Sequence, residues 1–148
     1  MCSDRLDPTA KGPDRQPIIF WTIKKNDQRG VRQLLDDGAS LETRGFGGRT
    51  PALAAAIVES WVMCLMLLRR GADPWASDQS GFTIAQRAAA SRLINPEAEE
   101  YAALQEVRGF LKERGLYDRI YQTDEVKALR AAGQWPPPEA RLQRPPSR

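Results

Sequence analysis

Leu34-Leu35-Asp36-Asp37-Gly38-Ala39 returns thirty-three positions later as Leu67-Leu68-Arg69-Arg70-Gly71-Ala72. The same interval separates Gly48 from Gly81. Repetition at a constant period of roughly 20 to 50 residues is typical of stacked, equivalent units that bury their apolar faces against each other. The repeat therefore predicts a row of similar units, an architecture that serves binding more often than catalysis.

The middle unit predicts a pair of helices. Thr50 can cap the first helix with its hydroxyl, and Pro51 suits the first helical position because an N–H there would have no partner within the helix. Residues 52–58 then form a short helix of small residues, and residues 61–70 form an apolar second helix. Gly71 ends the second helix because glycine readily adopts a left-handed conformation.

The flanking units follow the same plan, with a longer third unit. Asn95-Pro96-Glu97 combines a capping residue, a proline and an acidic first turn, so it predicts the start of a long helix that Gly115 ends. A further helix, ended by Gly133, closes the folded part. The helices expected outside the middle unit are 18–23, 31–35, 83–93, 96–114 and 123–132.

Length and composition indicate one domain with loose ends. The chain has 148 residues, of which 41% are hydrophobic, with 11 glycines and 11 prolines. Residues 1–16 are polar and without a period, and residues 134–148 are rich in proline and arginine, so we expect both segments to be disordered. Residues 17–133 would form the folded domain. A proline-rich ligand role for the tail remains an alternative.

The residue inventory excludes most catalytic and metal chemistry. There is no histidine, so catalytic triads and histidine metal sites are absent. The two cysteines, Cys2 and Cys64, are too few for a disulfide framework or a zinc cluster. Because Cys64 lies in an apolar helix, we expect it to be a small residue of the core. We expect no enzyme activity, no catalytic or metal-binding residues and no cofactor.

Charge and hydropathy narrow the possible partners. The formal net charge of +3 lies mostly in residues 134–148, which carry +2, so the folded part offers little of the dense basic surface that duplex binding requires. No run of eighteen apolar residues exists, and the N-terminal residues lack the apolar stretch of a secretory signal. We therefore expect a cytoplasmic protein without a membrane span.

Three segments carry a family resemblance. They are Gly48-Arg49-Thr50-Pro51-Ala52-Leu53-Ala54-Ala55-Ala56, Leu67-Leu68-Arg69-Arg70-Gly71-Ala72-Asp73-Pro74 and Asp78-Gln79-Ser80-Gly81. Together they resemble the ankyrin repeat, whose period is also thirty-three residues. The resemblance covers about residues 16–93. It implies an all-α fold, namely an ankyrin-repeat solenoid of two to three helix-turn-helix units with a helical C-terminal cap.

The chain departs from the family pattern at two kinds of position. The family's histidine in Thr-Pro-Leu-His is replaced by Leu53, and by Phe20 and Gln86 in the units on either side. The glycine between paired helices is replaced by Asn26 and Glu59. The contacts between hydroxyl and imidazole groups that usually join neighbouring repeats are therefore absent.

The resemblance implies a module that binds a partner protein through hairpin loops and the concave face of the first helices. Such a protein would be a monomer alone, and one implied role is that of a bacterial immunity protein that neutralises a toxin. The positions carried over from the family as partner-binding residues are Trp21, Lys24, Lys25, Arg44, Phe46, Trp75, Asp78, Phe82 and Arg87.

Several of these residues have a second interpretation. Trp75 can act as an exposed anchor or can fold back as packing, and the same choice holds for Phe46. Trp21 has apolar neighbours, which favours a place in the core. Lys24 and Lys25 can belong to a solvated face or, with the arginine tail, can bind nucleic acid or another anionic surface.

Overall fold

The computed structural model describes residues 9–138 and 140, and its regular elements are all helical, which confirms the all-α prediction. Two isolated bridges, between Lys11 and Pro17 and between Ser77 and Thr83, are the only other ladder contacts among these residues. The elements in chain order are α1 (Ile18–Lys24), α2 (Gln28–Asp36), the short 3₁₀ turn η1 (Phe46–Gly48), α3 (Pro51–Ile57), α4 (Trp61–Arg69), α5 (Ile84–Ala90), α6 (Glu99–Glu113) and α7 (Thr123–Ala131).

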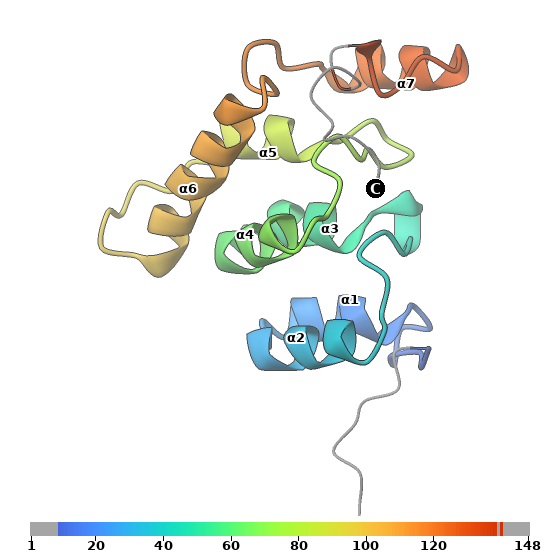
Figure 1. Cartoon of the computed structure of the whole chain (residues 1–148), viewed down its shortest axis with the longest axis vertical. Helices are drawn as coiled ribbons and strands as arrows, with labels where there is room; N and C mark the ends of the chain where they lie inside the picture. Colours follow the sequence, from blue (N-terminus) through green and yellow to red (C-terminus); the bar gives the residue numbers. More distant parts are fainter. Residues whose placement is uncertain (1–8, 139, 141–148) are drawn as a thin grey trace, which may run out of the picture.

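The first six α-helices form three pairs that stack in chain order (Figure 1). Each pair packs internally, and the first helices α1, α3 and α5 also contact their neighbours along the stack. The middle pair has neighbours on both sides, so α4 buries six of its nine residues, including Trp61 and Leu67. Apolar burial of this kind drives folding at roughly 25 cal/mol per Å².

Equivalent residues begin and end the equivalent helices. The Thr50 and Thr83 hydroxyls each accept a hydrogen bond from the backbone N–H three residues ahead, at 3.3 and 3.2 Å. Gly38 and Gly71 follow the second helices with φ of 108° and 105°, a conformation that costs glycine little. The residues that cap equivalent helices are therefore thirty-three positions apart, as the sequence period requires.

Two predicted helix boundaries in the third unit are wrong. α5 ends at Ala90 instead of residue 93, because Ser91 is extended with ψ of 137°. α6 begins at Glu99 instead of residue 96. The Asn95 side chain accepts the N–H of Glu97 at 3.0 Å, so the predicted start signal forms a separate turn before the helix.

Both flanking segments that were expected to be disordered contribute ordered residues. Residues 9–16 form a turn, joined to α1 by a hydrogen bond from Ile18 N to Ala10 O at 2.9 Å. At the other end, the Trp135 indole N–H donates to the Trp75 carbonyl at 2.9 Å. Long-range contacts that no local pattern encodes therefore extend the folded part beyond the expected limits. The remaining residues of the two segments, 1–8, 139 and 141–148, lie outside the described ranges.

Two non-glycine residues between paired helices adopt the left-handed conformation that glycine favours. Asn26 and Glu59 have φ of 56° and 62°, which is strained for a residue with a Cβ atom. Side-chain bonds offset part of this strain. The Glu59 carboxylate accepts from Trp61 Nε1 at 3.1 Å and from Ser91 Oγ at 2.7 Å. Glu59 therefore joins the middle unit to the third.

We predict that Glu59→Ala lowers the free energy of unfolding by about 2 kcal/mol, because it removes both bonds and keeps the strain. Glu59→Gly removes the same bonds but relieves the strain, so it should lower the value by about 1 kcal/mol less. Urea denaturation followed by circular dichroism measures both. Equal losses for the two variants would show that the positive φ is not strained.

Candidate partner-binding surface

The first helices of the three units present equivalent residues in rows. α1, α3 and α5 lie side by side, and residues thirty-three apart take corresponding places on them. The opposite sides of these helices are buried. Two outward rows, each made of exposed or half-buried residues, are Trp21, Ala54 and Arg87, and Lys25, Val58 and Ser91.

Hydrogen bonds between the units hold the ends of these helices in register. Ser60 Oγ donates to Asn26 Oδ1 at 3.1 Å, which joins the first unit to the second. Ser91 Oγ donates to Glu59 Oε2 at 2.7 Å, which joins the second to the third. Because Asn26 and Glu59 directly follow Lys25 and Val58, these bonds place the row from Lys25 to Ser91 on one continuous surface.

Cations on this surface lie over aromatic rings. Lys25 Nζ is 4.8 Å and Lys24 Nζ 5.9 Å from the centroid of the Trp21 ring. The Arg87 guanidinium lies 5.6 Å from the Phe82 ring. Such contacts contribute about 0.5–1 kcal/mol at exposed sites and restrict a flexible side chain. Five of the predicted partner-binding residues therefore form two clusters. One contains Trp21, Lys24 and Lys25, and the other contains Phe82 and Arg87.

Three large apolar side chains are exposed in the described part of the chain. Val58 is 56% exposed on the first-helix surface, and Phe46 is 61% exposed in the first hairpin. Ile94, which follows α5, is 85% exposed. Sequence reasoning did not single out Ile94, because it expected a helix through residue 93 and a cap directly after it.

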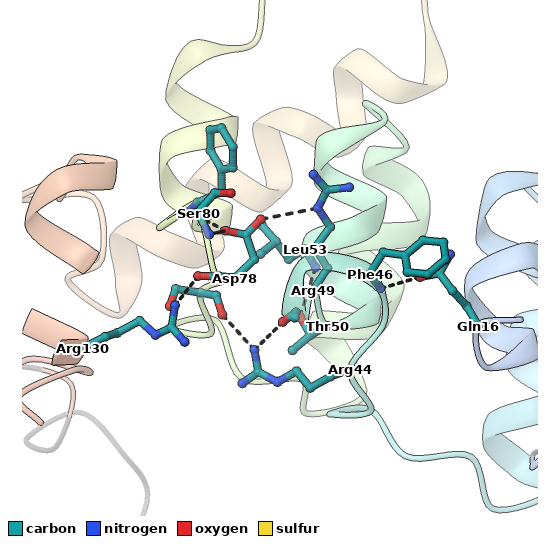
Figure 2. Close-up of polar contacts among 12 residues, drawn as sticks. Gln16, Arg44, Phe46, Arg49, Thr50, Leu53, Asp78, Ser80 and Arg130 are labelled. Carbon is teal, nitrogen blue, oxygen red and sulfur yellow. Dashed lines mark hydrogen bonds and ion pairs between the residues drawn. The ribbon is translucent and has the colours of Figure 1, made fainter. Parts of the chain in front are cut away.

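The backbone holds Phe46 at the tip of its hairpin. Its N–H donates to Gln16 Oε1 at 2.6 Å, and Gly47 behind it has φ of 67° (Figure 2). The Gly47 carbonyl also accepts the N–H of Gln79 at 2.7 Å, so the first hairpin is joined to the second. The ring of Phe46 is therefore presented on a positioned backbone.

Asp78 is buried and engaged inside the second hairpin, which corrects its prediction as a partner-binding residue (Figure 2). It is 1% exposed, and its Oδ1 accepts the N–H groups of Ser80 and Phe82, both at 2.9 Å. Arg49 Nε lies 3.4 Å from Oδ2. The carboxylate shapes the hairpin and is not accessible to a partner.

Arg44 joins consecutive hairpins. Its Nη1 donates to the carbonyls of Gly48 and Ser77, both at 2.8 Å. Arg130 on α7 adds a further bond, from its Nη1 to the Asp78 carbonyl at 2.6 Å. Arg44 remains exposed, yet these bonds give it a structural role that the resemblance does not imply.

Trp75 is packed inside the protein and is not an exposed anchor. It is 8% exposed, and the Trp135 ring meets it edge-on with centroids 5.8 Å apart. The Tyr121 ring also meets the Trp135 ring edge-on, with centroids 5.3 Å apart. Trp75 is thus covered by the C-terminal segment and cannot serve as an exposed anchor. Sequence reasoning missed Trp135, since it lies beyond the repeats in a segment whose prolines indicated disorder.

The buried thiol, the acidic residues and the helix lengths bear on three other expectations. Cys64 is fully buried, and burial raises the pKa of its thiol well above the usual value. Residues 9–138 and 140 contain no group of three or more His, Cys, Asp or Glu side chains arranged to hold a metal ion. No helix in that part of the chain has the length and hydropathy needed to cross a membrane.

Comparison of the sequence with protein-family models and with curated proteins found no match. The resemblance to ankyrin repeats therefore stays an expectation from the residues and their spacing.

We predict that Asp78→Ala lowers the free energy of unfolding by about 2–4 kcal/mol, because two backbone N–H groups lose their acceptor. Asp78→Asn retains an oxygen at that place and should cost about 1 kcal/mol. Thermal and urea unfolding of both variants tests this. A loss for Asp78→Asn as large as that for Asp78→Ala would mean that the charge, and not the acceptor, matters.

Glu42 provides a pH-dependent test of the contact between hairpins. Its Oε2 accepts the N–H of Asp73 at 2.9 Å, but desolvation dominates and raises the pKa of Glu42 above its ordinary value of 4.5. The folded chain therefore binds this proton more tightly than the unfolded chain, and the contribution of Glu42 to stability falls as pH rises. Glu42→Gln lacks this titration, so its stability relative to the parent should increase between about pH 4 and pH 7 in urea titrations. A constant or falling difference would contradict the assignment.

Proposed function

We propose that this chain is a protein-binding module of the ankyrin type, a solenoid of three helix pairs that acts without catalysis. The observation that supports it most is the correspondence between the thirty-three-residue period and the rows of equivalent outward residues on α1, α3 and α5. Stacked units of this kind create extended binding surfaces. The partner would contact these rows and the tip of the first hairpin.

The composition of the surface suits a protein partner. It combines exposed apolar groups, Val58 and Phe46, with aromatic rings and cations, which are residue types enriched at the energetic centres of interfaces. The polar contacts that join the hairpins and helix ends also order this surface before binding. An ordered surface loses less conformational entropy when a partner binds.

A narrower form of the proposal is that the partner is a toxin, which the module would neutralise by covering its active site or docking surface. This form rests on analogy with short ankyrin proteins. Nucleic acid is the alternative partner, bound through Lys24, Lys25 and the basic tail. Most of that tail lies outside the described residues, and the first-helix surface interleaves its cations with apolar groups, which favours a protein.

We predict that Val58→Asp weakens partner binding at least about tenfold, because an ionised side chain would be desolvated at the centre of the interface. Ala102→Asp places the same charge at an exposed site on α6 and should leave binding unchanged. Affinity capture from cells that express the protein, with quantitative mass spectrometry, compares the parent and the two variants. If the parent retains no protein, or all three chains retain the same amount, the proposal is wrong.

A further inference from the structure

We infer, on the basis of the function proposed above, that the segment recognised by the first-helix surface is an acidic stretch of a partner protein with an apolar residue among its carboxylates. The argument starts from the distribution of charge. α1, α3 and α5 contain no aspartate or glutamate, and their only charged residues are Lys24 and Arg87. Lys25 directly follows α1 and is exposed. The acidic residues of the helices lie instead on α2, α6 and α7.

The acidic side chains that border this surface are bound to neighbours. Glu59 accepts from Trp61 and Ser91. Asp27 caps α2 by accepting the N–H of Gly30 at 2.9 Å. Asp14 accepts two bonds from Gln16, which are the main reason why its pKa is lowered, with Lys24 a smaller cause. These hydrogen bonds engage the three carboxylates, while the charged residues of α1, α3 and α5 themselves are all cationic.

The cations are positioned to receive carboxylates. Lys25 and Arg87 lie over the rings of Trp21 and Phe82, which limits their motion. Arg87 Nε is the buried side-chain nitrogen that lacks a hydrogen-bond acceptor in the described part of the chain. Arg87 as a whole is half-buried, so a partner carboxylate would bind its terminal guanidinium nitrogens and not the enclosed Nε.

An apolar group separates the two cationic clusters. Val58 is exposed between Lys25 and Ser91 in its row, and the adjacent row places the small Ala54 between Trp21 and Arg87. Nucleic acids bind to closely spaced cations that follow a phosphate backbone. Cations at the two ends of a surface with an apolar centre instead match a peptide that carries carboxylates on both sides of an apolar side chain.

Photo-crosslinking in the full chain tests this inference. A photoreactive amino acid replaces Val58, the protein is expressed in its native cells, and mass spectrometry identifies the crosslinked segment. We expect that segment to carry a net negative charge and to include an apolar residue. A fluorescent synthetic peptide with that sequence should bind the parent chain, and raising salt from about 50 to 200 mM should weaken the binding.

Variants with altered charge then test which side chains contact the peptide. Lys25→Glu and Arg87→Glu should each weaken binding of the fluorescent peptide at least about tenfold, measured by fluorescence anisotropy. Lys127→Glu on α7 makes the same change at an exposed site away from the surface and should have no effect. Lys25→Gln, which only removes the charge, should weaken binding less than Lys25→Glu. Circular dichroism verifies that each variant is folded.

The outcomes separate this inference from the proposed function. A crosslinked protein segment that is neutral or basic overturns the inference and leaves a protein-binding function in place. Equal effects of Lys25→Glu and Lys127→Glu also overturn the inference. Crosslinking to nucleic acid, or to no macromolecule, contradicts both.

Discussion

Burial of the α3–α4 pair between its two neighbours is the constraint on which the rest of the structure depends. α4 is apolar on nearly every side, with Trp61, Met63 and Leu67 fully buried, so a single helix pair could not cover it. α1 covers one side of the middle unit, and α5 and α6 cover the other. Because each unit buries its apolar surface only against neighbours, the stack is stable as a whole and not as separate pairs.

The same constraint produces the surface on the first helices. Ala52, Ala55 and Ala56 are fully buried in α3, and such small residues let adjacent helices approach closely. The approach aligns residues thirty-three apart into rows, and the bonds of Asn26 and Glu59 hold those rows in register. The outward positions differ in charge and size, as Lys25, Val58 and Ser91 show, because they lie outside the buried core.

The ends of the stack explain why the third unit differs from the others. α6 is longer than the other second helices and packs along α4 with Leu104, Val107 and Leu111. α7 and the segment around Trp135 then cover the last hairpin (Figure 1). The Gln86 amide donates to the carbonyls of Gly81 and Tyr121, which joins this cap to α5.

The sequence by itself determined the period, the helix pairs, their caps and the burial of Cys64, because these depend on local spacing and on residue type. It also placed Trp21 in the first helix with Lys24 and Lys25 directly after it, and the structure extends that helix to Lys24. Tertiary structure alone decided that Trp75 and Asp78 are internal. Trp135, which covers Trp75, is 60 residues away in a proline-rich segment that indicated disorder, and Arg130, which donates to the Asp78 carbonyl, is 52 residues away on α7, outside the repeat. Contacts over such distances follow from the shape that the stack creates, which no periodic pattern encodes.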